Sequence, residues 1–332
     1  MHAPRSEDPG PAGGLARVTA VRSVTAAAAG RARAKRARVV ERDDWIAHEE
    51  PLSIRVDGRP LGVVMRTPGH DLELVRGLLF AEGILERADD VAAIAHCREL
   101  PPRTPESWRA DASDNVVLVT LARRRRTVRR RAWTASTSCG VCGRATIDEL
   151  RAVAPPVKGD LAVDVELLLE LPDRLREAQH GFARTGGLHA AGLFDGRGKL
   201  LVAREDVGRH NAVDKVVGAA LLHRLMPLSN CILQVSGRTS FEIVQKARRA
   251  GIPIVCAVSA PSTLAIELAR DGGQTLCGFA RGRSLNVYCG EARVRVRAGA
   301  AAPPAAAPAA PSPAARRRPP ARPRRSGRSG RR

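Results

Sequence analysis

The residues with the clearest chemical potential are two cysteines three positions apart, in the segment Thr-Ser-Cys-Gly-Val-Cys-Gly at 137–143. Glycines beside both leave the thiols of Cys139 and Cys142 sterically open, and a helical pattern follows them. A helix beginning near Arg144 would favour thiolate over thiol through its N-terminal dipole and the nearby positive charge. Because the thiolate is the nucleophile and the metal ligand, the segment predicts reactive or metal-binding sulfur.

Several kinds of thiol chemistry compete for this pair. A structural zinc site needs four ligands, usually two such pairs, and the sequence has no second one. A zinc deaminase needs His-x-Glu followed by Pro-Cys-x-x-Cys, whereas His189 lies after the pair with neither the Glu nor the Pro. A thioredoxin-type redox pair would normally follow the first strand of a βαβ unit, whereas this pair lies mid-chain in a loop. A persulfide carrier needs only an exposed cysteine on a mobile loop, ideally with a second thiol nearby, and fits best. Cys231 and Cys256 lie in apolar strands and are expected to be buried.

Two strand-to-helix junctions offer candidate anion sites. One follows the apolar strand 231–235, and the other follows the strand 254–258 and contains Ser262. Small hydroxyl residues and free backbone N–H groups at a helix start can bind phosphate, although they are also ordinary N-caps. Two such junctions on adjacent strands mark the ligand crevice of an open α/β sheet, so we expect a phosphorylated ligand. The first junction comprises Ser236, Gly237, Arg238, Thr239 and Ser240, of which the last three, with Ser262, are the expected phosphate contacts.

Two further polar segments have open interpretations. The run 204–211, which contains Asp206 and His210, is dense in polar residues and is either a solvated capping turn or part of a site. A glycine-bearing basic turn near the end of the fold could hold phosphate, stack a base on its aromatic ring, or be an edge hairpin. It consists of Phe279, Ala280, Arg281, Gly282, Arg283 and Ser284.

The elements that must position these residues form two units. In the first, 45–131, alternating strands flank the turn Asp57-Gly58, Asp71 is expected to cap a helix ending near Gly83, and 116–121 is a strand. The second, 132–297, has strands at 188–194, 200–202, 231–235 and 254–258, with helices at 212–225, 239–250 and 262–270. Alternating strands and helices predict an α/β fold with a sheet covered on its faces.

The charge of the chain is concentrated outside these units. The formal net charge is +21, and three segments account for all of this positive charge. They are the first forty residues, the nine Arg at 301–332 and the seven Arg within 123–131. We therefore expect 1–44 to be a disordered basic lead-in and 298–332 a disordered Ala/Pro/Arg tail. Basic tails bind nucleic acid non-specifically, but aromatic residues for stacking are scarce, which makes specific nucleic-acid binding the least favoured function.

The location of the protein also follows from simple features. No segment approaches the ~20 apolar residues of a membrane span, and the N-terminus lacks the apolar core of a signal peptide. Seven cysteines, an odd number with only one close pair, argue for reduced thiols. We therefore expect a cytoplasmic protein with no membrane association.

Taken together, the motifs resemble the FdhD/NarQ family of formate dehydrogenase accessory sulfurtransferases. Seven matching segments occur in order over about 49–290, and the basic loop and both tails fall outside them. The matching segments are 50–52 (Glu-Pro-Leu), 65–69 (Met-Arg-Thr-Pro-Gly), 138–143, 185–189 (Thr-Gly-Gly-Leu-His), 205–215, 236–240 and 278–281 (Gly-Phe-Ala-Arg).

The resemblance implies a function and a fold. Family members receive sulfur from a cysteine desulfurase as a persulfide on the C-x-x-C loop and pass it to a bis-molybdopterin guanine dinucleotide cofactor for formate dehydrogenase. The implied fold is a cytidine-deaminase-like three-layer α/β domain with a small α+β N-terminal subdomain, and members are homodimers. Carried over, Cys139 is the persulfide position, Cys142 is its partner, and 279–284 is the cofactor-binding segment.

Other functions remain as alternatives. A non-catalytic chaperone for the molybdenum cofactor would bind the dinucleotide without needing Cys139 for activation of the dehydrogenase. A thiol-disulfide oxidoreductase would require both cysteines, whereas a persulfide carrier could tolerate the loss of Cys142.

Overall fold

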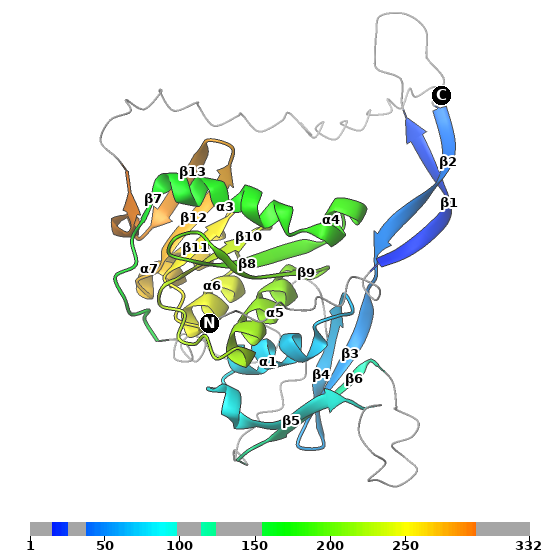
Figure 1. Cartoon of the computed structure of the whole chain (residues 1–332), viewed down its shortest axis with the longest axis horizontal. Helices are drawn as coiled ribbons and strands as arrows, with labels where there is room; N and C mark the ends of the chain where they lie inside the picture. Colours follow the sequence, from blue (N-terminus) through cyan, green and yellow to red (C-terminus); the bar gives the residue numbers. More distant parts are fainter. Residues whose placement is uncertain (1–14, 26–37, 98–113, 124–154, 297–332) are drawn as a thin grey trace, which may run out of the picture. The chain divides into compact units, whose positions relative to one another are not determined.

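The computed structural model describes residues 15–25, 38–97, 114–123 and 155–296 (Figure 1). The chain divides into two compact units, Met1–Val296 and Arg297–Arg332, and every described residue belongs to the first. The predicted boundary at 131/132 and the predicted tail 298–332 lie outside the described residues.

A mixed six-stranded sheet in the order β13-β12-β11-β10-β8-β9 positions the candidate site. The neighbours β10, β11 and β12 are parallel, while β8 lies antiparallel to both β9 and β10, and β13 antiparallel to β12. The strands are β8 (His189–Asp195), β9 (Leu200–Asp206), β10 (Cys231–Val235), β11 (Ile254–Ala257), β12 (Thr275–Arg281) and β13 (Ser284–Cys289). All residues of β10 and β11 are buried, as expected of central strands covered on both faces.

Helices cover both faces of this sheet and make three layers (Figure 1). On one face lie α5 (Arg209–Leu222), α6 (Phe241–Arg249) and α7 (Thr263–Asp271), the last two being the crossovers between the parallel strands. On the other lies α3 (Val165–Glu177), followed by the short α4 (His180–Thr185). The layered α/β architecture is as predicted, while the closer similarity to a cytidine-deaminase fold stays a prediction.

The N-terminal part is a four-stranded sheet in the order β4-β3-β6-β5, with helix α1 (Asp71–Ala81). Its strands are β3 (Glu50–Val56), β4 (Arg59–Arg66), β5 (Val91–His96) and β6 (Val116–Leu121). Asp57 and Gly58 both have positive φ, 48° and 76°, which is the backbone of the predicted hairpin turn. The helix cap was predicted one residue too late: His70 is the N-cap, and the Asp71 carboxylate instead accepts hydrogen bonds from Arg66.

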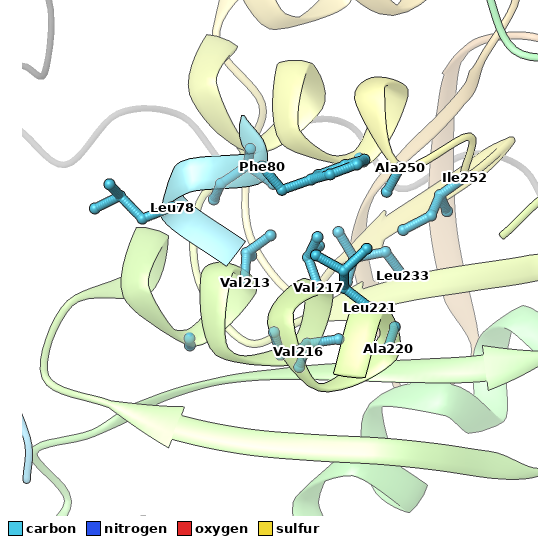
Figure 2. Packing of buried hydrophobic residues seen from close by; sticks show 14 of the residues in the cluster. Leu78, Phe80, Val213, Val216, Val217, Ala220, Leu221, Leu233, Ala250 and Ile252 are labelled. Atoms are coloured by element: carbon cyan, nitrogen blue, oxygen red, sulfur yellow. The ribbon is translucent and has the colours of Figure 1, made fainter. Parts of the chain in front are cut away.

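A single core joins the N-terminal part to the α/β layers. Figure 2 shows Leu78 and Phe80 of α1 beside Val213 and Val217 of α5 in the same apolar cluster. The helix backbones approach closely because Gly77 and Gly218 lie at the crossing, where a Cβ on Gly218 would overlap the backbone oxygen of Glu73.

The predicted disordered lead-in 1–44 is wrong in part. Leu15–Thr25 forms strand β1, which pairs antiparallel with β2 (Arg38–Ala47). The segment Val-Thr-Ala-Val-Arg-Ser-Val-Thr at 18–25 is rich in β-branched residues, which favour strands even without alternation of apolar and polar positions. A two-residue parallel pair, β7 (Val163–Asp164) with β14 (Val294–Arg295), and short 3₁₀ turns at Ala88–Asp90 and Glu291–Arg293 complete the described elements.

Candidate functional site

Cys139 and Cys142 lie outside the described residues, so their predicted role stays a prediction. Three of the described cysteines contrast with this predicted exposed pair, because they are buried in strands of the six-stranded sheet. They are Cys231, Cys256 and Cys277. Burial raises the pKa of the Cys231 thiol to about 11, so this thiol is protonated at neutral pH. The prediction that Cys231 and Cys256 are buried small apolar residues is confirmed.

The two predicted anion junctions lie side by side at one edge of the sheet. The backbone N–H of Thr239, after β10, donates to the Ala260 carbonyl oxygen at 3.2 Å, and the Ser262 N–H donates to the Thr239 carbonyl at 3.0 Å. Because β10 and β11 are parallel neighbours, their carboxyl ends meet there, as the sequence predicted.

Most hydroxyl groups of these junctions bond within the protein. The Ser236 Oγ accepts from the Ala190 N–H at 2.9 Å, the Ser240 Oγ lies 2.7 Å from His210 Nε2, and the Ser262 Oγ accepts from the Ala265 N–H at 3.3 Å. Ser262 is therefore an ordinary N-cap of α7. Within the described part of the chain, the buried Thr239 Oγ1 has no hydrogen-bond partner.

The basic turn at 279–284 is the connection between β12 and β13. Phe279 has a positive φ of 52° at an irregularity in the β12–β13 pairing, and its N–H donates to the Ser259 carbonyl next to the second junction. Ala280 is fully buried in the core, backbone included, so it does not reach a ligand at the surface. Arg281, Gly282, Arg283 and Ser284 are exposed. The segment is thus an edge hairpin whose tip is free to bind.

A pocket of about 410 Å³ joins the first junction to this hairpin. That volume lies within the range of small-molecule sites. Ser236, Arg281 and Gly282 line one part, and residues of α3, α4 and the start of β8 line the rest. The lining residues are Pro172, Asp173, Arg176, Gln179, Phe182, Gly186, Gly187, Leu188, His189, Ser236, Val258, Arg281 and Gly282. The structure therefore brings together two predicted binding segments that are about 45 residues apart in sequence.

The pocket carries positive charge beside a neutral histidine. Burial lowers the pKa of His189, and the charges of Arg209 and Arg238 lower it further, against the opposing effect of Asp206. His189 packs on Gly237, where a Cβ would come within 3.1 Å of the imidazole Nδ1. An arrangement in which arginines outweigh the nearby acid favours an anionic ligand.

The polar run 204–211 has mainly a supporting role. The buried Asp206 carboxylate accepts from the backbone N–H groups of Thr67 and Gly208 and from the Asn211 amide, and pairs with Lys215 Nζ at 2.8 Å. His210 lies between Ser240 and Glu242, and burial followed by the charge of nearby Arg209 lowers its pKa to about 3. Neither Asp206 nor His210 lines the pocket.

Sequence reasoning did not identify the wall formed by α3 and α4. The sequence does contain an indication of α3, namely the helical spacing of Leu168, Leu171 and Leu175, which are buried against the sheet. Pro172, inside the helix, obscured that signal because proline usually ends a helix.

The described residues contain no group of three or more His, Cys, Asp or Glu arranged to hold a metal ion. Nor is any described helix long and apolar enough to span a membrane.

Comparison with known proteins places these features in a family. Residues 47–295 match the model of the FdhD/NarQ family. Proteins named "Sulfur carrier protein FdhD" from Streptomyces avermitilis and Sulfurisphaera tokodaii are 49% and 44% identical, over 79% and 76% of this chain and 93% and 92% of theirs. The crystal structure of a proposed formate dehydrogenase accessory protein from Desulfotalea psychrophila is 25% identical with a TM-score of 0.61, covering 84% of this chain and 100% of that one. The chain therefore belongs to the FdhD/NarQ family.

Proposed function

We propose that this protein is a sulfur carrier that serves formate dehydrogenase. Its relatives are named "Sulfur carrier protein FdhD", and the family match over residues 47–295 spans the segment with the paired cysteines. In this proposal Cys139 accepts sulfur as a persulfide from a cysteine desulfurase, with Cys142 as its loop partner, and passes it to the bis-molybdopterin guanine dinucleotide cofactor. The protein would work as a cytoplasmic homodimer, with the desulfurase and the catalytic subunit of the dehydrogenase as its partners.

The single observation that carries the cargo part of this proposal is the pocket. Its volume of about 410 Å³ has room for one nucleotide end of the dinucleotide, and Arg281 and Gly282 of the family's cofactor-binding segment line it. Arg238 and backbone N–H groups at the start of α6 would meet phosphate oxygens, because a helix N-terminus and an arginine both favour anions. Ser262 is not among these phosphate contacts, because its hydroxyl caps α7 and its backbone N–H donates to the Thr239 carbonyl oxygen.

The sulfur step would follow thiol-disulfide exchange. The Cys139 thiolate attacks the outer sulfur of the donor persulfide, a new S–S bond forms, and the donor cysteine leaves as thiolate. No net oxidation occurs in this exchange. The outer sulfur of Cys139 is then available for transfer to the cargo.

The test is intact-mass spectrometry after incubation with a cysteine desulfurase and cysteine. Wild type should gain the mass of one sulfur, Cys139→Ala should not, and Cys142→Ala should still gain it. If wild type gains no sulfur from a desulfurase shown to be active, the alternative of a non-catalytic cofactor chaperone is favoured, because that role requires cargo binding but no sulfur on either thiol.

A further inference from the structure

Three polar side chains at the starts of α5 and α6 form a hydrogen-bonded chain that the sulfur step does not use. His210 is the second residue of α5, Ser240 is the N-cap of α6, and Glu242 lies in the first turn of α6. The two helices lie on the same face of the six-stranded sheet (Figure 1). His210 Nε2 lies 2.7 Å from Ser240 Oγ, and His210 Nδ1 lies 3.3 Å from Glu242 Oε2. A hydroxyl, an imidazole and a carboxylate joined in this order are the arrangement that activates a serine as a nucleophile.

The direction of these hydrogen bonds follows from the chemistry of the three groups. An ionised carboxylate only accepts, so the Nδ1 atom that faces Glu242 carries the imidazole proton. His210 is neutral at pH 7, because burial followed by the charge of nearby Arg209 lowers its pKa to about 3. A neutral imidazole with its proton on Nδ1 has a lone pair on Nε2, which therefore accepts the hydroxyl proton of Ser240. His210 is thus placed as the general base for Ser240, and Glu242 fixes its tautomer and orientation.

Ser240 differs in this respect from the other serines of the two strand-to-helix junctions. The Ser236 and Ser262 hydroxyls each accept from a backbone N–H group, whereas the Ser240 hydroxyl does not cap its own helix. Ser240 is partly exposed, and the side chains of His210 and Glu242 are 25% and 22% exposed. A small molecule can therefore reach the hydroxyl from the surface.

The surroundings of Ser240 favour negative charge. Because its side chain does not cap α6, the first N–H groups of that helix have no acceptor within the helix, and such groups can stabilise the oxyanion that forms when a nucleophile attacks a carbonyl group. Arg238 is exposed two positions before Ser240, and the buried Nε of Arg209, next to His210, has no hydrogen-bond partner within the described part of the chain. Two arginines in these places favour an acyl group that carries a negative charge of its own.

We propose that Ser240, His210 and Glu242 form an esterase site for activated esters of anionic carboxylic acids. Ser240 Oγ attacks the carbonyl carbon while His210 Nε2 takes up the hydroxyl proton, and the N–H groups at the start of α6 stabilise the oxyanion. His210 then gives the proton to the leaving alcohol as the ester C–O bond breaks, which leaves the acyl group on Ser240. Water attacks this acyl group by the same proton path and releases the acid, so ester and water give acid and alcohol with no change of oxidation state. This activity is separate from the proposed sulfur transfer, and an ester would compete with the phosphate proposed at the same helix start.

The reaction should be slow, and its intermediate should accumulate. General-base catalysis is most efficient when the pKa of the base lies near the working pH, and the burial that keeps His210 unprotonated also makes it a weak base. An activated ester still acylates the serine readily because its leaving group is good. The serine ester that results has a poor leaving group, so its hydrolysis limits turnover and produces a burst in the first turnover.

The test follows release of 4-nitrophenolate from 4-nitrophenyl acetate and from the monoester 4-nitrophenyl succinate, with mass mapping of the acylated peptide. The full chain carries Cys139→Ala and Cys142→Ala, because free thiols at these positions would also be acylated. We expect a burst of about one 4-nitrophenolate per chain and an acyl group on Ser240. Ser240 should react at least ~100-fold faster than Ser262, an exposed serine whose hydroxyl accepts from the backbone. The anionic succinate should react several-fold faster than the acetate.

Two variants test the base and its orientation. His210→Gln removes the base, and Glu242→Gln lets an amide donate to Nδ1, which moves the imidazole proton to Nε2 and removes the acceptor for the hydroxyl proton. Each should slow acylation of Ser240 at least ~100-fold. Glu267→Gln, the same change at an exposed glutamate of α7, is the matched control and should leave the rate unchanged.

The site is overturned if Ser240 reacts no faster than Ser262, or if Glu242→Gln, shown by circular dichroism to be folded, reacts as fast as its parent. Equal rates with the acetate and the succinate would overturn the preference for anionic acyl groups. None of these results bears on sulfur loading, which the intact-mass experiment tests separately.

Discussion

Lys215 Nζ lies 2.8 Å from Asp206 Oδ2, in an ion pair whose side chains are 1% and 0% exposed. Lys215 also donates to the carbonyl oxygen of Thr67, and Asp206 accepts from the Thr67 N–H. The pair therefore joins two segments of the chain, around 65–69 and 205–215, that are far apart in sequence. Both segments belong to the motifs that resemble the family, and neither contributes a lining residue to the pocket described above.

Replacing Lys215 with Met should destabilise the protein strongly. The change leaves the Asp206 carboxylate buried without its cation, which costs about 3–5 kcal/mol of the free energy of unfolding. Urea unfolding followed by circular dichroism measures the change. Lys199→Met, at an exposed lysine, is the control and should cost less than about 0.5 kcal/mol. A Lys215→Met protein as stable as the control would show that the pair contributes little to stability.

A second prediction concerns the crossing of α1 and α5. Gly218→Ala should destabilise the protein by about 2 kcal/mol or more, because the new Cβ would overlap the backbone oxygen of Glu73. Helix propensity alone predicts the opposite sign, a gain of roughly 1 kcal/mol on replacing a helical glycine with alanine. Thermal and urea unfolding give the sign directly.

The control for that change is Gly187→Ala, whose Cβ would meet nothing nearer than the Ala47 Cβ at 3.4 Å. It should leave the free energy of unfolding within about 0.5 kcal/mol of wild type. A stabilised Gly218→Ala variant would mean that the two helices separate easily at their crossing.

Much of the fold was predictable because the local signals agreed with the final packing. The apolar run 231–235 coincides with β10, and the Asp57-Gly58 turn joins β3 to β4. Strand β1 and helix α3 were missed for local reasons: β1 shows no alternation, and Pro172 interrupts the pattern of α3. Packing of its leucines against the sheet, which the sequence does not display, stabilises α3 despite Pro172, whereas the β-branched residues of β1 favour its strand locally.

The stability of the protein should depend on pH through His210. Burial, with the nearby charges of Arg209 and Lys246, lowers the folded pKa of His210 to about 3 from 6.5. Between these values the unfolded chain binds the proton and the folded chain does not, so the free energy of unfolding falls as pH falls from 6.5 toward 3. Lowering the pH from 7.5 to 5.0 should remove roughly 2 kcal/mol of stability through this group.

His210→Gln isolates that contribution, because glutamine keeps a polar group beside Ser240 and Glu242 but does not titrate. The difference in unfolding free energy between wild type and variant should shrink by the same roughly 2 kcal/mol between pH 7.5 and 5.0. A difference independent of pH would mean that His210 takes up its proton equally in both states.

A fourth prediction tests how α4 is held. Glu205→Gln replaces the carboxylate that accepts from the N–H groups of Gly181 and Phe182. Hydrogen bonds to a charged acceptor contribute about 1.5–3 kcal/mol, so hydrogen exchange at these two amides should accelerate at least ~10-fold. Because Phe182 lines the pocket, the affinity for GDP should fall several-fold.

Glu170→Gln, which removes an exposed ion pair with Arg174, is the matched control for Glu205→Gln. It should change neither amide exchange at 181–182 nor nucleotide binding. Faster exchange in Glu205→Gln with unchanged GDP affinity would show that the position of Phe182 does not matter for the ligand.

The candidate site was less predictable than the fold. Ser236, Arg281 and Gly282 were identified because strand-to-helix junctions and basic turns carry local signals, and the structure places them around one pocket. Arg176, Gln179 and Phe182 are not marked by any local sequence pattern, because their position in the pocket wall depends on how α3 and α4 pack against the sheet. The hydroxyls of Ser240 and Ser262, expected to meet phosphate, are instead bonded to His210 and to the α7 backbone.

Arg238 is the junction residue best placed to act through its charge, since it is exposed and its field lowers the pKa of His189 in the pocket. Arg238→Ala should weaken GDP binding by about 5-fold, equivalent to about 1 kcal/mol, the size of a solvent-accessible ion contact. The difference from wild type should narrow as salt is raised from 0.05 to about 0.5 M, because screening weakens exposed charge pairs. Arg224→Ala, which removes an exposed arginine paired with Asp89, should leave binding unchanged at both salt concentrations. An affinity of Arg238→Ala equal to that of wild type at low salt would remove Arg238 from the site and leave phosphate recognition to Arg281 and the backbone at the start of α6.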